Sequence, residues 1–322
     1  MSNIFAQPLP AGPLGGRKAK NTFDWRLIVL TIAMIAVGIL FGSLNPYYLS
    51  FRNALDIGRQ ASLLAVGAIG AHIIIVSGEV DLSVGAVVGL LSVSIPGMID
   101  LGLPVPIILA MAIILGGAAG ALNGFITLRL MVPSFLATLG TMAIFRGLAI
   151  HISNQPRTIY NQTFIGLFNN QLLGIPLTIV YPLVLTVVVA TVWRYTRFGV
   201  FIRAVGSNEQ SARYRGLNTR GVKFMAFALA GVFSAIGAIM LLGRTQMGLA
   251  VAADGLELNA IAAVILGGGR LGGGKGSVIG TVMGAILLTM IFSGIAGLGL
   301  SASWQLMIKG AILVIVIALM RK

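Results

Sequence analysis

Two carboxylates in an apolar stretch are the first residues in this chain that could do chemistry. Glu79 and Asp81 interrupt the run Ser77–Gly85, which reads S-G-E-V-D-L-S-V-G. Ionised groups at membrane depth are costly and usually functional. An acidic residue just before a helix also accepts hydrogen bonds from the free N–H groups of the first turn. The pattern leaves two roles open, a helix cap and a place on a substrate path. It disfavours a glycosidase carboxylate pair, because connections this short do not form a sugar-cleaving cleft.

A second acidic group lies in an apolar segment that is hard to read as one helix. Residues 247–268 reach membrane-spanning length only by including Asp254, Gly255 and Glu257. Asp254 or Gly255 predicts a helix start, with Glu257 in the first turn, where the helix dipole favours an acid. We therefore expect a crossing with a broken helix. A break at membrane depth is tolerated where it lines a cavity, and transporters place substrates at such breaks. Glu257 and Asn259 become candidates for a translocation path.

A glycine-rich run, Gly267–Ser277, resembles a phosphate-binding loop only in part. It carries the required Gly274 and Lys275, but Gly276 stands where a Ser or Thr hydroxyl would bind magnesium. An apolar span precedes it, whereas a phosphate loop follows a buried strand. Nucleotide binding is disfavoured. We expect a tight turn whose glycines supply positive φ, and the turn could also position helices at a cytosolic gate.

Three isolated polar residues fall within apolar segments. They are His72, Arg146 and Lys309. A lone His in such a position is more often packed and hydrogen-bonded than a ligand. Arg146 could extend to the outer membrane interface. Both Arg146 and Lys309 could pair with a carboxylate such as Glu79 or Glu257. A structural role is favoured for all three.

The segment 194–223 concentrates seven of the 22 basic residues between two apolar runs. Ser207 or Asn208 predicts a helix N-cap, helical residues continue to about Tyr214, and Gly216 ends them. A short helix on a basic loop could fit a groove on a separate protein. The alternative is a solvated connector without a partner. The residues expected to couple to that partner are Gly206, Ser207, Asn208, Glu209, Ala212 and Gly216.

Composition places the chain in a membrane. Of its 322 residues 57% are apolar and 9% are charged, against about 25% charged in soluble domains. The chain has no Cys, which excludes disulfides and thiolate chemistry. No metal-ligand cluster or nucleophile–base pair is readable, so we expect neither an enzyme nor a bound metal or cofactor. The net charge of +14 would suggest nucleic acid in a soluble protein. Here the basic residues fall between apolar runs, which predicts no nucleic-acid partner.

Ten apolar segments, most near the 20 residues that cross a bilayer, predict an all-α polytopic transmembrane bundle of about ten spans. The segments are 27–44, 61–77, 82–99, 105–127, 132–153, 174–193, 222–243, 247–268, 277–300 and 303–320.

The distribution of Lys and Arg predicts the orientation. With ten spans, 16 basic residues fall in connections on one side and four on the other. The positive-inside rule places both termini in the cytoplasm. We expect residues 1–24 to be a flexible cytosolic tail and residues 25–322 to form a single transmembrane domain. The longest connection on the outer side, 154–173, could form a short interfacial helix or a docking rim.

Four motifs, in order along the chain, resemble the permeases of bacterial sugar ABC importers of the ribose, xylose, arabinose, rhamnose and autoinducer-2 type, and more distantly the branched-chain amino-acid permeases. They are S-G-E-V-D-L-S-V-G at 77–85, P-S-F-L-A-T-L-G-T-M-A-I-F-R-G at 133–147, R-F-G-V-F-I-R-A-V-G-S-N-E-Q-S-A-R-Y-R-G at 197–216, and the glycine-rich stretch at 262–284. One departure is Glu79, where the family usually has Gly.

The resemblance implies a bacterial inner-membrane protein that works with partners. Two cytosolic ATP-binding subunits would dock on the 207–216 helix, and a periplasmic or lipid-anchored binding protein would deliver a sugar. A second permease copy, identical or a paralogue, would complete the pore. A branched-chain amino-acid or nucleoside permease, or an ion-coupled transporter, remains an alternative. Small polar residues could line the path, and the candidates are Ser77, Ser83, Ser92, Asn123 and Thr138.

Overall fold

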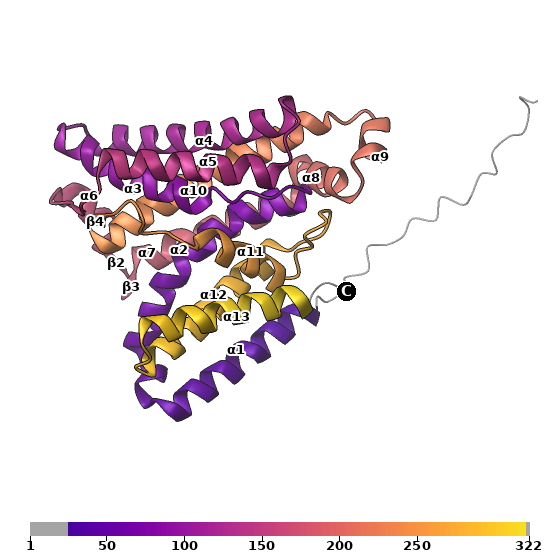
Figure 1. Cartoon of the computed structure of the whole chain (residues 1–322). Coiled ribbons are helices and arrows are strands. Elements are labelled where there is room, and N and C mark those ends of the chain that lie inside the picture. The colour runs from indigo at the N-terminus through magenta and orange to yellow at the C-terminus, as the bar shows by residue number, and fades with distance from the viewer. Residues whose placement is uncertain (1–24, 320–322) are drawn as a thin grey trace, which may run out of the picture.

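The structure is a computed structural model that describes residues 25–319. The predicted tail, 1–24, lies outside this range. The described chain is a bundle of helices with two short antiparallel ribbons (Figure 1). One ribbon pairs β1 (Arg157–Thr158) with β4 (Met247–Gly248), and the other pairs β2 (Gln171–Leu172) with β3 (Ile175–Pro176).

Seven helices of the described chain are long and apolar enough to cross a membrane, which confirms the predicted polytopic bundle. They are α1 (Trp25–Leu44), α2 (Phe51–Val76), α4 (Val105–Arg129), α5 (Ser134–Ile152), α7 (Leu177–Tyr195), α10 (Thr219–Thr245) and α12 (Val278–Gly297). The remaining three apolar segments form α3 (Val84–Asp100), α11 (Leu256–Leu266) and α13 (Ala302–Leu319).

Shorter elements connect these helices at the two ends of the bundle. A 3-10 helix, η1 (Pro46–Leu49), joins α1 to α2, and α6 (Gln162–Asn169) lies between α5 and α7. The connection 154–173, for which a short helix was one of two alternatives, therefore contains the helix α6. Two helices, α8 (Arg197–Ser207) and α9 (Glu209–Tyr214), lie between α7 and α10. We call the end of the bundle that carries α8 and α9 the coupling side, which is at the right of Figure 1.

Contacts at its two ends place α1 relative to α8 and α9. At the coupling side Arg26 of α1 donates to the carbonyl of Gly268, in the glycine-rich loop that precedes α12. At the opposite end Asn45, after α1, donates to the carbonyl of Gly297, at the end of α12. The described part of the first segment therefore begins on the same side as α8 and α9.

Helices α2 and α10 form the centre of the bundle, and both are mostly buried. Glycines allow α4 to approach α10 closely. A Cβ on Gly116 would meet the Gly231 carbonyl, and a Cβ on Gly120 would meet the Phe227 carbonyl. Small residues at such positions let membrane helices pack with their backbones in contact. The outer helices α1 and α7 instead expose large apolar side chains, as expected for surfaces that face lipid.

The eighth segment confirms the predicted break. After α10, β4 pairs with β1 at the end opposite the coupling side, and only Leu256–Leu266 is helical before the glycine-rich loop. An 11-residue helix spans about 16 Å, roughly half of the hydrocarbon thickness. Gly255 begins the helix with a φ of 79°, a conformation that suits glycine. Residues 249–255 therefore cross the first half of the bundle as irregular backbone.

Candidate functional site

The basic segment 194–223 folds locally as the sequence predicts. Asn208 is the N-cap of α9, since its side chain accepts a hydrogen bond from the Ser211 N–H at 2.8 Å. The helix ends at Tyr214, and Gly216 follows with a φ of 82°. Ser207 belongs to the last turn of α8. The N-cap left open between two residues is thus Asn208.

One face of α9 packs against the rest of the chain. Ala212 is buried, and the Glu209 carboxylate turns toward the start of α10. The exposed residues of α9 are Gln210, Ser211, Arg213 and Tyr214, and Tyr214 is 81% exposed. A partner that docks on α9 would therefore meet this outer face first. Glu209 and Ala212 would act through contacts inside the chain.

Glycines join α8 to two other segments at the coupling side. A Cβ on Gly206, in the last turn of α8, would meet the backbone carbonyl of Val76 at the end of α2. The same carbonyl accepts a hydrogen bond from the Gly274 N–H at 2.9 Å. Gly268, Gly273 and Gly274 all have positive φ, as expected for the glycine-rich loop. The loop therefore holds the ends of α2 and α8 together.

A charged cluster connects α9 to the membrane helices. The Lys223 Nζ of α10 lies 2.7 Å from Glu209 Oε2 and 2.7 Å from Glu79 Oε1. The Lys223 side chain is 10% exposed and that of Glu79 is 16% exposed. Hydrogen bonding to Lys223 lowers the pKa of Glu209 from its usual value. We call Glu79, Glu209 and Lys223 the charge cluster.

The partners of Glu209 differ in how much solvent they meet. Arg213, on the same helix, lies 2.9 Å from Glu209 Oε1, and its side chain is 61% exposed. Thr219 also donates to Glu209 at 3.1 Å. An exposed ion pair contributes little to stability, whereas losing one partner of a buried pair is costly. Lys223 is therefore the strongest link between α9 and the bundle.

Four of the path candidates meet in one buried hydrogen-bonded network. Asp81 Oδ1 accepts from the backbone N–H and the hydroxyl of Ser83, both at 2.7 Å, and Ser83 is the N-cap residue of α3. Asn123 of α4 donates to the Ser83 hydroxyl at 2.7 Å and accepts from Thr141 of α5 at 2.6 Å. Thr138 accepts from the Leu82 N–H at 3.1 Å.

This network holds α3, α4 and α5 together. Ser83, Asn123 and Thr138 are each at most 1% exposed, and Asp81 is 5% exposed. Buried polar groups that satisfy one another rigidify and specify a packing arrangement. The geometry therefore favours a structural role of Asp81 in the connection before α3, although no side chain caps the first turn of that helix.

The irregular segment 249–255 lies against α3 and α5. The Ser92 hydroxyl of α3 donates to the Leu249 carbonyl at 2.8 Å. Arg146 of α5 donates to the Ala250 carbonyl and forms an ion pair with Asp254. The sequence allowed a carboxylate partner for Arg146, such as Glu79 or Glu257, and the partner in the structure is Asp254. The irregular chain carries Asp254 past α5.

Glu257 is the acidic group with an open hydrogen-bonding position. Its Oε2 is buried and has no hydrogen-bond partner among residues 25–319. A Cβ on Gly85 of α3 would meet that oxygen, so only a glycine leaves room for it there. Asn259 follows on α11 and is half-buried. Both candidates thus lie beside the break in the eighth segment.

The remaining polar candidates have structural surroundings. His72 is buried, hydrogen-bonds Thr281 at 2.8 Å and packs edge-on against Trp193, as expected for a packed histidine. Lys309 lies over the Phe292 ring at 5.1 Å rather than beside a carboxylate. Ser77 donates to the Ile74 carbonyl and ends α2. No cluster of potential metal ligands occurs among the described residues.

Two residues that make these contacts escaped the sequence analysis. Lys223 was counted only as one more basic residue of the segment 194–223, and its two partners lie 14 and 144 positions away. No local pattern signals such a contact. Thr141 could have been found, because Thr138 and Thr141 are three residues apart on one face of a helix.

Comparison with known proteins agrees with this architecture. Residues 53–317 match the family described as branched-chain amino acid transport system / permease component. The chain is 34% identical over 311 residues to the probable ABC transporter permease protein YphD of Escherichia coli (strain K12), covering 96% of this chain and 94% of that protein. It is 34% identical to the ribose import permease protein RbsC of Bacillus subtilis (strain 168), covering 90% of this chain and 91% of that protein.

A third relative is the xylose transport system permease protein XylH of Escherichia coli (strain K12). It is 30% identical, and the match covers 94% of this chain and 93% of that protein. No solved structure matches the chain significantly. The similarity to these relatives runs from end to end, so it concerns the whole bundle rather than a single motif.

Proposed function

The chain belongs to the family of branched-chain amino acid transport system permease components, and we propose that it is the membrane subunit through which an ATP-driven importer moves a sugar. It is a multi-span inner-membrane permease rather than an enzyme. The observation that carries the proposal is the end-to-end similarity to permeases named for ribose and xylose. The family description names branched-chain amino acids, so such an amino acid is the second candidate cargo.

The coupling side faces the cytoplasm in this proposal. It holds the basic segment 194–223, in agreement with the positive-inside rule. A separate ATPase subunit binds the outer face of α9, where Arg213 and Tyr214 are exposed. A binding protein delivers the sugar at the opposite end, and a second permease copy completes the pore.

The charge cluster transmits the motion of α9. Glu209 moves with α9, Lys223 is part of α10, and Glu79 lies in the connection from α2 to α3. A displacement of α9 therefore acts on two transmembrane elements at once. The glycine contact between Gly206 and Val76 adds a rigid backbone link to α2.

The translocation path runs along the break in the eighth segment. Glu257 has an unpaired buried oxygen there, and Asn259 offers both a donor and an acceptor. Broken helices at mid-membrane are where transporters place their substrates. Asp81, Ser83, Asn123 and Thr138 support the helices around this path and contact cargo only if the network opens.

Reconstitution tests the proposed function. The permease, its ATPase and its binding protein would be placed in vesicles, and ATP-dependent uptake of labelled D-ribose, D-xylose and L-leucine would be compared. We expect uptake of a sugar that requires all three components. Uptake by this chain alone under an ion gradient would refute the proposal, and a preference for leucine would change the cargo.

Labelling tests the orientation independently. The chain has no Cys, so single-cysteine variants report one position each. Tyr214→Cys lies on exposed α9, and Thr158→Cys lies in exposed β1 at the other end. We expect an impermeant thiol reagent applied outside the cell membrane to label Thr158→Cys only. The reverse labelling pattern would contradict the orientation.

A further inference from the structure

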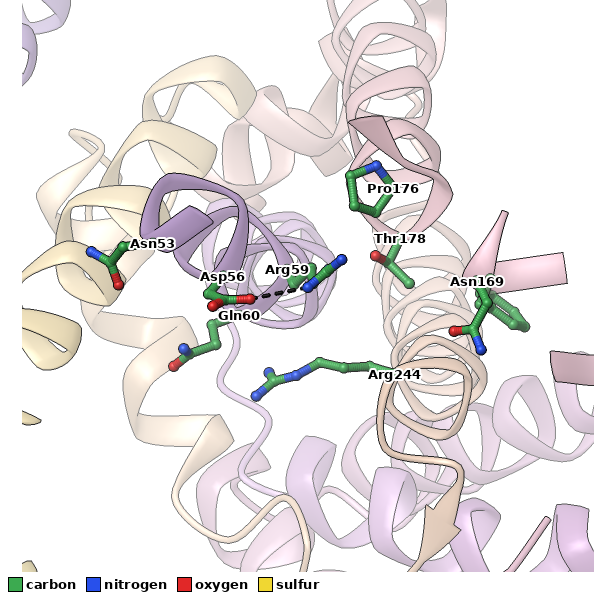
Figure 2. Close-up of a pocket in the computed structure, with 9 residues that line it drawn as sticks. Asn53, Asp56, Arg59, Gln60, Asn169, Pro176, Thr178 and Arg244 are labelled. Carbon is green, nitrogen blue, oxygen red and sulfur yellow. Dashed lines mark hydrogen bonds and ion pairs between the residues drawn. The ribbon is translucent and has the colours of Figure 1, made fainter. Parts of the chain in front are cut away.

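A polar cavity lies at the end of the bundle opposite the coupling side. Its volume is about 500 Å³, within the range of about 300–1,000 Å³ typical of small-molecule sites. Figure 2 shows its side chains, which come from four separate parts of the chain. The lining residues are Asn53, Asp56, Arg59 and Gln60 of α2, Arg244 of α10, Phe168 and Asn169 of α6, and Pro176 and Thr178 around the start of α7.

We propose that this cavity is a receiving site for the sugar before it enters the path between the helices. The inference rests on the proposed function for the class of cargo, and it adds a binding site at the outer end of the permease. The sequence analysis considered Phe168 and Asn169 only as part of the connection 154–173, and it assigned no role to the lining residues of α2, α7 and α10.

One lining group, the Thr178 hydroxyl, has no hydrogen-bond partner, and a ligand could provide one. Thr178 is 5% exposed, and its hydroxyl has no hydrogen-bond partner among the described residues. A buried hydroxyl without a partner costs free energy, so such groups are normally paired or bind a ligand or water. In Figure 2 Thr178 lies on the side of the cavity that faces Arg59.

The other polar groups form a mixed set of donors and acceptors. Asp56 Oδ1 lies 3.0 Å from Arg59, and the second carboxylate oxygen remains as an acceptor. Asn53 uses its Nδ2 to donate to the Tyr48 carbonyl at 2.7 Å, which leaves its Oδ1 for the cavity. Arg244 supplies donors only, whereas Asn169 supplies both kinds of group.

This mixture fits a neutral polyhydroxylated molecule better than an ion. An anion would meet the Asp56 carboxylate, and a cation would meet the two guanidinium groups of Arg59 and Arg244. Each hydroxyl of a sugar donates one hydrogen bond and accepts others, so it can use neighbouring donors and acceptors together. The Phe168 ring adds an apolar wall for the C–H groups of the ligand.

Direct binding to the purified full-length permease in lipid nanodiscs tests the inference. Saturation-transfer NMR with D-ribose and D-xylose would compare the wild-type protein with Thr178→Val and Asn169→Ala. Two matched controls lie on the same end of the bundle but outside the cavity. They are Thr158→Val, in β1, and Asn170→Ala, adjacent to Asn169, and both residues are exposed.

We expect each cavity variant to weaken sugar binding by roughly two- to tenfold, the change expected for one neutral hydrogen bond. The two controls should bind as the wild-type protein does. Equal binding by all four variants would overturn the inference, because the sugar would then bind elsewhere. Thr178→Val removes only an unpaired hydroxyl, so the variant should fold and show normal helical circular dichroism. A weaker saturation-transfer signal then reports lost sugar binding at the cavity.

Uptake by the assembled importer separates this inference from the proposed function. If the assembled importer takes up ribose or xylose and the isolated permease binds neither, the receiving site is refuted and the importer stands. If the permease binds a sugar and the importer transports none, the proposed function fails while the cavity remains a sugar site. A cavity variant that loses affinity for the binding protein while sugar binding stays unchanged would also refute the receiving site.

Discussion

Removing the Lys223 charge should separate α9 from the bundle. In Lys223→Met the apolar part of the side chain is largely retained, but Glu79 and Glu209 lose a partner that lies 2.7 Å from each. Because the Glu79 side chain is 16% exposed and that of Glu209 is 35% exposed, only the first carboxylate stays largely desolvated. Breaking a buried ion pair costs about 3–5 kcal/mol, and an exposed one costs about 0–1 kcal/mol.

The expected loss in the free energy of unfolding is therefore about 3 kcal/mol, at the lower end of the range for buried ion pairs. A loss of that size corresponds to roughly a hundredfold change in the unfolding equilibrium, and the same substitution removes the Lys223–Glu209 contact that holds α9. In reconstituted vesicles the variant should insert normally and retain ATP hydrolysis by the partner subunit, while ATP-dependent uptake falls. The measured ratio of sugar imported to ATP hydrolysed reports this uncoupling.

Arg213→Met is the matched control. Arg213 contacts the same Glu209 carboxylate from the solvent side, with 61% of its side chain exposed. Its loss should cost less than about 1 kcal/mol, so coupling should fall only slightly. Equal effects of the two substitutions would refute the reasoning, because the charge cluster would then be no stronger than a surface ion pair.

A second substitution tests whether the buried, unpaired Glu79 carboxylate causes the loss of stability. Adding Glu79→Gln to Lys223→Met removes the carboxylate that the single variant leaves buried without a partner. The double variant should regain part of the lost thermal stability, as replacement of a buried ion pair by uncharged groups is often tolerated. If the double variant were less stable than either single variant, the desolvation argument would be wrong.

Three further predictions concern other contacts. Gly206→Ala should uncouple ATP hydrolysis from uptake because its Cβ would collide with the Val76 carbonyl, whereas Gly216→Asn, at an open position with positive φ, should be tolerated. Asn123→Leu should lower the melting temperature by leaving Ser83 and Thr141 without buried partners, at a cost of about 1–3 kcal/mol for each group measured by thermal unfolding. Since the pKa of Glu209 is lowered, its contribution to stability is present above the unfolded-state pKa near 4.5 and is lost only as pH falls through the lower folded-state value, which unfolding at graded acid pH would detect.

The sequence was sufficient for the architecture because the signals that fix it are local. Apolar length identified the membrane helices, and Asp254, Gly255 and Glu257 marked the one segment that is not a continuous helix. Capping chemistry placed the start of α9 within one residue, because the Asn208 side chain bonds an N–H only three positions away. Each of these features is decided within a few residues of chain.

The pairings between distant segments could not be predicted in the same way. From the sequence alone, several carboxylates could have lain near Arg146. The irregular path of residues 249–255 brings Asp254 beside it. Glu79 departs from the Gly usual in the family, and its meaning became visible only when Lys223 was found beside it. The cavity at the other end depends on four segments that meet only in the folded bundle.

Helices α2 and α10 connect the two proposed sites. Lys223 and Arg244 are 21 residues apart on α10, about 32 Å along a straight helix, and α2 runs from Asp56 in the cavity to Val76 beside Gly206. A ligand shifts a conformational equilibrium only if it binds the two states with different affinity. A cavity carried by one rigid element would keep its geometry and could not respond to α9. This cavity combines α2 and α10 with α6 and α7, so any displacement of α2 or α10 relative to α6 and α7 changes the distances between Arg244, Asp56 and Thr178 and hence the affinity for the sugar.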